Sequence, residues 1–309
     1  MFVLSAQVDS TLDSAGQRVH SAGGEIAGGP TPLLRVVVSC YTRPVAAIFT
    51  ASPSSGLDRA AAAVTPVILC WNEAPNLERT LQALQWARRV VVVDSGSTDE
   101  SEALARAYPN VDWRLRAYDD FAGQWQFAVA GTGIETEFAL ALDADMAVTP
   151  AFVAELEAGF CRSGCDGGLV RFQYRLDGRR LLGSVYPPQL RLFRPAEVRI
   201  TQPGHTQEFA IAGRTYRFSA PVIHDDRKPL ARWVQSQVKY VELEAARIER
   251  AGGRLGVKDR LRLTGLAPWP MAAWSYGRAG GPVAGRAALR YAWERMTFET
   301  LLALRLLRK

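Results

Sequence analysis

The segment FALALDADM, from Phe138 to Met146, combines an apolar run with two acidic residues at its end. The run is typical of a buried strand, and Asp143 and Asp145 follow where such a strand would open into a loop. Side chains two residues apart on a strand point to the same side, so we expect both carboxylates to face one site. Two hard oxygen donors in this arrangement suit Mg²⁺ or Mn²⁺ carrying substrate phosphates. A solvated strand end with two incidental acids has the same pattern, so the rest of the chain has to decide.

Two earlier segments repeat the pattern of a buried strand, a polar loop and a helix. The first is TPVILCW, from Thr65 to Trp71, and it leads into Asn72 and Glu73. The second is RVVVVD, which ends in Asp94 before a turn rich in serine and glycine. Strands that alternate with helices predict an α/β fold whose parallel sheet has right-handed crossovers. Ligands bind at the carboxyl ends of such strands, so these polar residues and the two later aspartates should converge on one edge.

Composition sets the limits of the fold. With 309 residues and 48% hydrophobic content, the chain can bury a substantial core. It has no uninterrupted apolar run of about 18 residues, so no transmembrane helix is predicted. The four cysteines lack the paired spacing of a zinc site, and reduced thiols in a cytoplasmic protein are the simpler interpretation.

The pattern of the chain predicts three regions. Residues 1–64 are rich in Ser, Gly, Ala and Pro, and we expect them to be disordered or to lie upstream of the true start. Residues 65–246 form the predicted main domain, with one half at 65–148 and the other at 149–246. Residues 247–309 form a basic amphipathic tail.

Charge is distributed unevenly along the chain. From Arg227 onward there are 17 Lys and Arg against 6 Asp and Glu, a net charge of +11, whereas the whole chain carries +6. A basic segment interleaved with Trp, Tyr and Leu suits an anionic surface, which can be a membrane leaflet or nucleic acid.

The loop after the first strand distinguishes between classes of nucleotide site. A nicotinamide-type fold needs G-x-G-x-x-G there to bring a helix N-terminus against a pyrophosphate, but the chain has Trp-Asn-Glu-Ala-Pro from Trp71 to Pro75. Acidic loops repel bare phosphate. This edge should therefore bind a nucleotide through its base and ribose, with a cation between acid and phosphate, as in a sugar-nucleotide site.

Three segments at this spacing, PVILCWNEAPNL, VVVVDSGSTDES and LALDADM, resemble the donor half of family 2 glycosyltransferases, which have the GT-A fold. FAGQWQFAV resembles a segment of the branch that includes lipopolysaccharide-core glucosyltransferases. The resemblance covers roughly Val64 to Ala246, and it implies that residues 65–246 are a catalytic domain with a donor-binding half at 65–148 and an acceptor half at 149–246. It implies a Rossmann-like GT-A fold with a mostly parallel sheet, helices on both faces and C-terminal amphipathic helices. It also implies a nucleotide-diphosphate sugar donor, with UDP-sugars favoured, a divalent metal (Mg²⁺ or Mn²⁺) and an inverting transfer.

The resemblance also assigns roles in donor and metal binding. The donor-binding set is Asn72, Glu73, Asp94, Gln124 and Asp143, and the metal set is Asp145, Asp143 and His224. Glu73 and Asp94 look like the residues that hold the base and its ribose, and Asp145 looks like the direct metal ligand. Asn72 can instead brace its loop, and Asp94 can be a turn acid. His224 can instead be a structural histidine at a strand end, although imidazole is an acceptable ligand for Mn²⁺.

A second polar cluster lies late in the chain, in GHTQEFAIAG and APVIHDDRKP. In the family pattern, a late acidic residue removes the proton of the acceptor hydroxyl, and Glu208 and Asp226 are the candidates. Glu208 stands where the related branch has a His-Glu pair, but His205 here lies three residues earlier. Arg227 and Lys228 can neutralise the departing diphosphate.

The tail has two broken apolar segments with Arg, Trp and Tyr. This pattern is typical of a helix that lies in a membrane interface, with arginines on anionic headgroups, although a helix packed on the protein body is the alternative. No zinc, helix-turn-helix or RNP-like motif supports nucleic-acid binding. Because the resembling branch acts on lipid-linked saccharides, we expect a lipid-linked or lipopolysaccharide-type acceptor and a cytoplasmic, peripheral location on the inner face of the cytoplasmic membrane.

Three functions remain open from the sequence. The favoured one is an inverting glycosyltransferase that moves a single sugar in the biosynthesis of a cell-envelope glycan. The second is a HAD-like phosphohydrolase, because D-x-D after a strand also describes that site, with Asp143 as its nucleophile. The third is a non-catalytic envelope-assembly protein that retains the fold.

Overall fold

The computed structural model describes residues 57–251 and 255–308. Of the predicted extension, residues 1–56 lie outside the described residues, and its last residues form helix α1 (Asp58–Ala63) and the first position of β1. Helix α1 and the first residue of β1 therefore lie before the expected boundary at residue 65.

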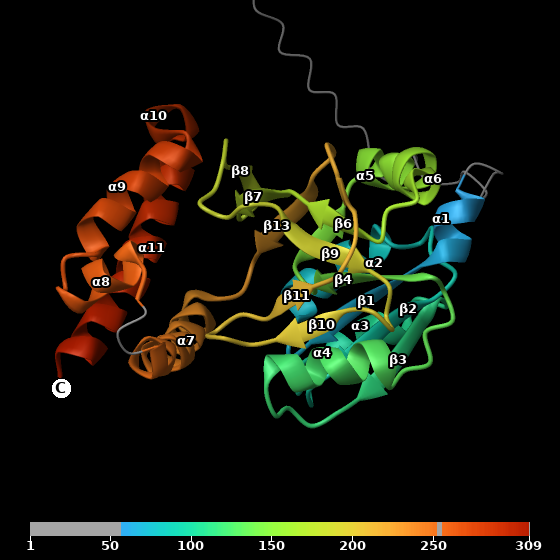
Figure 1. Ribbon diagram of the computed structural model, residues 1–309, viewed down its shortest axis with the longest axis horizontal. Coiled ribbons are helices and arrows are strands. Elements are labelled where there is room, and N and C mark those ends of the chain that lie inside the picture. The colour runs from blue at the N-terminus through green and yellow to red at the C-terminus, as the bar shows by residue number, and fades with distance from the viewer. Residues whose placement is uncertain (1–56, 252–254, 309) are drawn as a thin grey trace, which may run out of the picture. The chain divides into compact units, whose positions relative to one another are not determined.

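A seven-stranded sheet with the order β12-β6-β9-β4-β1-β2-β3 carries the candidate site (Figure 1). Its strands are β1 (Val64–Cys70), β2 (Val90–Asp94), β3 (Val111–Leu115), β4 (Phe138–Asp143), β6 (Gly167–Val170), β9 (Gln189–Phe193) and β12 (Thr215–Arg217). Strands β1 to β4 are mutually parallel, whereas β9 runs antiparallel to β4 and β6. The expected α/β fold with a mostly parallel sheet is confirmed.

Helices cover both faces of this sheet, which is why its central strands β1, β2 and β4 are almost continuously apolar. The helices of this part are α2 (Ala74–Gln82), α3 (Ser101–Arg106), α4 (Phe121–Ala130), α5 (Pro150–Glu155), the π-helical turn η1 (Leu156–Phe160) and α6 (Cys161–Ser163). On β1, Ile68 belongs to the same apolar cluster as Leu77 of α2, and its neighbour Val67 to the cluster of Trp125 on α4. The alternation of β1 thus divides the core into two layers.

Helix α5, which follows the D-x-D motif, begins with a side-chain cap. Thr149 is the N-cap of α5, and its hydroxyl oxygen accepts a hydrogen bond from the backbone N–H of Phe152 at 3.1 Å. Pro150 occupies the first turn, where its missing N–H has no partner to lose.

Two smaller sheets complete the part around the site. One has the order β5-β13-β7-β8, and its strands are β5 (Met146–Val148), β7 (Phe172–Leu176), β8 (Arg179–Arg180) and β13 (Val222–Asp226). The other pairs β10 (Arg199–Thr201) with β11 (Glu208–Ala210). Because β13 runs antiparallel to β5, His224 lies opposite Met146, the residue that directly follows the D-x-D motif.

Five helices form the C-terminal part: α7 (Leu230–Ala251), α8 (Val257–Leu263), α9 (Pro268–Ala279), α10 (Gly281–Ala284) and α11 (Arg286–Leu307). Helix α11 packs against both α9 and α7. Among the apolar residues of α7, Val241 and Ile248 are buried, whereas Val234 and Val238 are 42% and 54% exposed. In the described ranges, none of the helices has the length and apolar character needed to cross a bilayer.

Candidate active site

The register of the parallel strands brings the predicted donor-site residues to one edge. Asp94, the last residue of β2, pairs with Cys70 at the end of β1. Asp143, the last residue of β4, pairs with Leu69 on the other side of β1. Glu73 follows β1 directly as the N-cap residue of α2. Three segments that are distant in sequence therefore end side by side.

Lys228 joins the acids of these segments. Its Nζ lies 2.9 Å from a carboxylate oxygen of Glu73, 3.3 Å from one of Asp226 and 3.8 Å from one of Asp145. The side chains of Glu73, Asp145 and Lys228 are largely buried, with that of Lys228 only 16% exposed, and the side chain of Asp226 is partly buried. The loop after β1, the D-x-D motif and the end of β13 thus meet at one cation.

Asn76 provides a second, uncharged link between the same segments. It is fully buried in the first turn of α2, and its Nδ2 donates to Glu73 and to Asp226 at 3.0 Å each. Its Oδ1 accepts from the backbone N–H of Arg227 at 2.9 Å. The guanidinium of Arg79 adds a bond of 2.7 Å to the carbonyl oxygen of Asp225. The end of β13 is therefore fixed to α2 by amide and backbone hydrogen bonds as well as by charge.

The crowded charges shift the ionisation of this cluster. Burial raises the pKa of Glu73 to about 7, against the opposing effect of the Lys228 ammonium. Burial also raises the pKa of Asp145, while the charges of His224 and Lys228 act in the other direction. Burial alone would lower the pKa of Lys228, but the carboxylates around it raise that pKa above its ordinary value. Burial would raise the pKa of Asp226, but Lys228 and the hydrogen bonds from Lys228 and Asn76 keep it below its usual range. Lys228 therefore remains a cation at any physiological pH.

Two of the three predicted metal ligands lie together. The Oδ1 atom of Asp145 is buried without a hydrogen-bond partner and lies 3.4 Å from Nε2 of His224. The backbone N–H of Asp225 donates to the carbonyl oxygen of Asp145 at 3.1 Å, which holds the two strands in this position. A carboxylate with a free oxygen next to an imidazole fits the donor set of Mn²⁺ or Mg²⁺ with phosphate oxygens as further ligands.

Asp143, the third predicted ligand, points elsewhere. Its carboxylate lies 3.4 Å from the guanidinium of Arg191, a buried residue that also bonds to Gln189 at 2.9 Å. Across residues 57–251 and 255–308, no three His, Cys, Asp or Glu side chains are grouped closely enough to hold a metal ion. Asp143 instead lines a cavity of about 370 Å³ together with Glu208 of β11. The predicted metal trio is thus divided between a pair and a neighbouring cavity.

Three of the predicted donor-binding residues brace the loops of this edge. Both oxygens of the buried Asp94 carboxylate bond to the following turn, to the N–H groups of Gly96 and Ser97 and to the Ser97 hydroxyl. Gln124 is buried, and its Nε2 donates to the hydroxyl of Ser95 at 2.9 Å. Asn72 likewise makes the contacts of a residue that braces its loop.

Asn72 has a left-handed backbone with a φ of 53°, which asparagine tolerates better than most residues. Its Oδ1 accepts from the backbone N–H of Thr98 at 2.6 Å and joins the loop after β1 to the loop after β2. The preceding residue, Trp71, is 53% exposed, and the guanidinium carbon of Arg232 lies 4.3 Å from the centre of its ring. Trp71 is not among the predicted site residues. The sequence feature that could have identified it is its position between an apolar strand and the Asn-Glu pair.

Arg227 and His205 do not reach the acidic cluster. Two guanidinium nitrogens of Arg227 donate to Asp225 at 3.0 and 2.8 Å. Nδ1 of His205 lies 3.2 Å from Glu244 of α7. His205 therefore contacts α7 and makes no recorded bond to Glu208.

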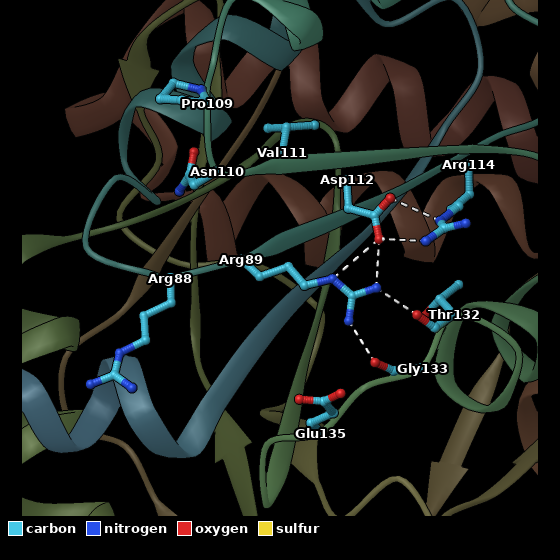
Figure 2. A pocket seen from close by; sticks show the side chains of 10 residues that line it. All are labelled: Arg88, Arg89, Pro109, Asn110, Val111, Asp112, Arg114, Thr132, Gly133 and Glu135. Atoms are coloured by element: carbon cyan, nitrogen blue, oxygen red, sulfur yellow. Dashed lines mark hydrogen bonds and ion pairs between the residues drawn. The ribbon is translucent and has the colours of Figure 1, made fainter.

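A different hollow of about 550 Å³ lies at the opposite end of the sheet (Figure 2). It is lined by residues that precede β2 and β3, among them Arg89 and Asn110. As Figure 2 shows, the guanidinium groups of Arg89 and Arg114 both bond to Asp112, and Arg89 also donates to the carbonyl oxygens of Thr132 and Gly133. These contacts neutralise two of its three arginines and fix Arg89 as a brace between β2 and the end of α4.

The fold is the GT-A fold that the sequence predicts. Residues 65–220, half of the chain, match the model of "Glycosyl transferase family 2". The chain belongs to that family, and the predicted resemblance is confirmed.

The chain is also similar to individual proteins. It is 38% identical over 66 residues to the "Lipopolysaccharide core biosynthesis glycosyltransferase LpsC" of Rhizobium meliloti (strain 1021), which is 20% of this chain and about a quarter (24%) of that relative. S. aureus TarS 1-349 in complex with UDP-GlcNAc is 12% identical, with 80% of this chain and 91% of that chain covered and a TM-score of 0.44. Glucosyl-3-phosphoglycerate synthase from Mycobacterium tuberculosis, in complex with Mn²⁺, UDP and glucosyl-3-phosphoglycerate, is 19% identical, with 39% and 47% covered and a TM-score of 0.31.

Proposed function

We propose that this chain is an inverting glycosyltransferase that moves one sugar from a UDP-sugar to a saccharide or lipid-linked acceptor of the lipopolysaccharide type. The observation that carries the proposal is the meeting of Glu73, Asp145 and Asp226 at the Lys228 ammonium, since it joins three distant segments at one sheet edge. Family membership and the partial match to a lipopolysaccharide core glycosyltransferase support it. Residues 65–246 are the proposed catalytic domain.

The donor would lie along the loops after β1 and β2. The exposed ring of Trp71 offers a face on which a nucleobase can stack, because base and indole are both flat and polarisable. Asp94 and Gln124 would act by holding the turn around Ser95. Glu73, which follows β1, and Asp143, at the end of β4, are the proposed contacts to the ribose and the base.

The diphosphate would be bound with Mg²⁺ or Mn²⁺ on Asp145 and His224, whose free oxygen and ring nitrogen are 3.4 Å apart. When bound, the metal supplies charge that stabilises the leaving diphosphate. Arg227 stays a prediction for the same purpose, because its guanidinium would first have to leave Asp225.

Glu208 is the favoured general base. It is exposed and lines the same cavity as Asp143, whereas Asp226 is already bound to Lys228 and Asn76. In the proposed step, the acceptor hydroxyl oxygen forms a bond to the anomeric carbon, the bond from that carbon to the diphosphate oxygen breaks, and the hydroxyl proton passes to the Glu208 carboxylate. Attack opposite the leaving group inverts the anomeric configuration.

Donor binding followed by transfer tests the proposal. Calorimetry with UDP-, GDP- and dTDP-sugars, with and without Mn²⁺, should detect a UDP-sugar complex, and an inner-core oligosaccharide should then release UDP. Glu208→Gln should lower kcat by about 10²-fold or more while donor affinity stays unchanged. The exposed Glu197 provides the control, since Glu197→Gln removes an acid outside the cavity. No binding of any nucleotide sugar would contradict the proposal.

We further propose that α9 and α11 contact an anionic membrane surface from the cytoplasmic side. The two tryptophans of α9, Trp269 and Trp274, are 68% and 59% exposed, and Trp293 on α11 is 59% exposed. Arg278 and Arg286 are exposed on the same helices. Interfacial aromatic rings with arginines suit the boundary between headgroups and acyl chains.

Vesicle sedimentation tests this contact. The protein should sediment with phosphatidylglycerol-containing vesicles and less with pure phosphatidylcholine, and added salt should weaken binding. The double variant Trp274→Ser/Trp293→Ser should lose most of the binding, whereas Leu115→Ser, which removes an exposed apolar residue on β3, should keep it. Equal sedimentation of both variants would reject α9 and α11 as the contact.

A further inference from the structure

The position of Lys228 creates a conflict at the proposed metal site. The Asp145 carboxylate has one oxygen 3.4 Å from His224 and the other 3.8 Å from the Lys228 ammonium. The first oxygen is buried and has no hydrogen-bond partner, so it is available to a ligand. The second faces a positive charge that is already in place.

A divalent ion on Asp145 would therefore approach a fixed ammonium. Like charges a few ångströms apart repel, and even with water-like screening an ammonium at such a distance lowers the affinity of a divalent ion roughly tenfold or more. In the protein alone, Lys228 also provides a counter-charge next to Glu73, Asp145 and Asp226, so part of their negative charge is balanced without a metal ion.

A nucleoside diphosphate removes the conflict. It brings negative charge that can lie between the ammonium and the metal ion and attract both. The affinity for the metal should then depend strongly on whether the nucleotide is bound. By thermodynamic reciprocity, the metal must strengthen nucleotide binding by the same factor.

We propose that Lys228 is an internal counter-cation that prevents Mn²⁺ or Mg²⁺ from binding alone and makes metal binding conditional on a nucleoside diphosphate. This inference rests on the proposed nucleotide-sugar function and adds a positioning residue to it. Lys228 acts through Asp145 and Glu73, and the ammonium is the group that matters.

A purely structural role for Lys228 is the competing interpretation. The end of β13 is, however, also fixed to α2 by Asn76, which bonds to both Glu73 and Asp226, and by Arg79, which bonds to the backbone of Asp225. These links remain when Lys228 is replaced. The fold around the site should thus persist in variants of this residue.

The binding of Mn²⁺ alone can be measured from the electron paramagnetic resonance signal of the unbound ion. This measurement does not depend on activity. Wild-type protein should bind Mn²⁺ weakly, and UDP should tighten the binding tenfold or more. Lys228→Met should bind Mn²⁺ without UDP at least tenfold more tightly than wild type, and the factor by which UDP tightens Mn²⁺ binding should be smaller than in wild type. Lys228→Arg keeps the charge and should behave as wild type.

Lys239→Met is the matched control, because it removes a lysine that lies over the ring of Tyr118 and makes no recorded contact with the acidic cluster. It should leave Mn²⁺ binding unchanged. If Lys228→Met does not fold, Lys228→Gln and the wild-type measurement still decide, since Mn²⁺ binding to wild type that is independent of UDP overturns the inference. Unchanged Mn²⁺ affinity in folded Lys228→Met also overturns it. Failure of UDP to bind wild type under every condition would instead reject the proposed function.

Discussion

Replacing Arg262 with methionine should destabilise the C-terminal helices strongly. Arg262 of α8 has a side chain that is 3% exposed, and it donates two hydrogen bonds to Glu299 of α11 at 2.8 and 2.7 Å and one to Glu244 of α7 at 2.7 Å. The Glu299 side chain is fully buried. Without the guanidinium, Glu299 keeps a buried charge that has lost its ion-pair partner, which typically costs about 3–5 kcal/mol.

Urea and thermal denaturation measure this loss. For a domain of this size, each kcal/mol lowers Tm by about 2–4 °C, so a fall of roughly 6–20 °C is expected. Arg305→Met is the control, because Arg305 makes exposed ion pairs with Glu242 and Glu249 on the same helix pair and its loss should change little. The double variant Arg262→Met/Glu299→Met should recover part of the stability, since it removes the unpaired charge. A loss for Arg262→Met no larger than that for Arg305→Met would refute the argument.

Three further predictions concern the site and its support. Asp145→Asn should abolish the effect of Mn²⁺ on UDP binding, whereas Asp143→Asn should keep that effect and lower turnover, because only Asp145 adjoins His224. Calorimetry measures the Mn²⁺ effect and kinetics measures turnover. Equal loss of the Mn²⁺ effect in both variants would contradict the assignment of the metal site to Asp145 alone. Trp71→Ala should weaken UDP binding by roughly 5- to 100-fold, the range of one base–aromatic stack, and unchanged affinity in calorimetry would remove the proposed base platform. Burial tends to raise the pKa of Glu244, but hydrogen bonds from His205 and Arg247 hold it well below its ordinary value of 4.5. Its stabilising effect is thus complete above about pH 4.5 and is lost as the pH falls further, so the difference in unfolding free energy between wild type and Glu244→Gln should shrink below that pH, and a constant difference would contradict this.

Local patterns along the chain were sufficient for much of the fold. The apolar runs ending in Asp94 and Asp143 predict strands because both faces of a parallel sheet are buried. Thr149 and Pro150 predict a helix start because their chemistry acts within one turn. These signals depend only on neighbours in sequence, and the structure confirms them.

The centre of the site could not be predicted in this way. Asn76 is an ordinary first-turn residue of a helix by sequence, and its bonds to Asp226 span 150 positions. In the sequence, Lys228 stands out only as a basic residue that follows two acids. No local pattern predicts that its ammonium lies next to Glu73 and Asp145. Long-range contacts of this kind depend on how β13 is seated against β5, which local patterns do not encode.

The same limit applies to α7. Apolar side chains of a helix usually face inward, but Val234 and Val238 are exposed, so helical spacing alone does not show which face of α7 is buried. The buried face of α7 includes the polar residues Gln237 and Glu244. Glu244 can be buried because the guanidinium of Arg262 donates a hydrogen bond to it. A charged partner supplied by another helix decided which face is buried, and that partner lies 18 residues further along the chain.

Helix α7 also connects the two proposals about function. Near its start, Arg232 lies over the ring of Trp71 and donates to the carbonyl oxygen of that residue at 2.8 Å. Further along the same helix, Glu244 is bound by Arg262, which in turn holds α11. At 1.5 Å per residue, these two points are about 18 Å apart along one continuous helix. A lipid contact made through α11 would therefore be transmitted to the donor loop by a rigid element, so the height of the site above the surface would be set by α7 and not by a flexible linker.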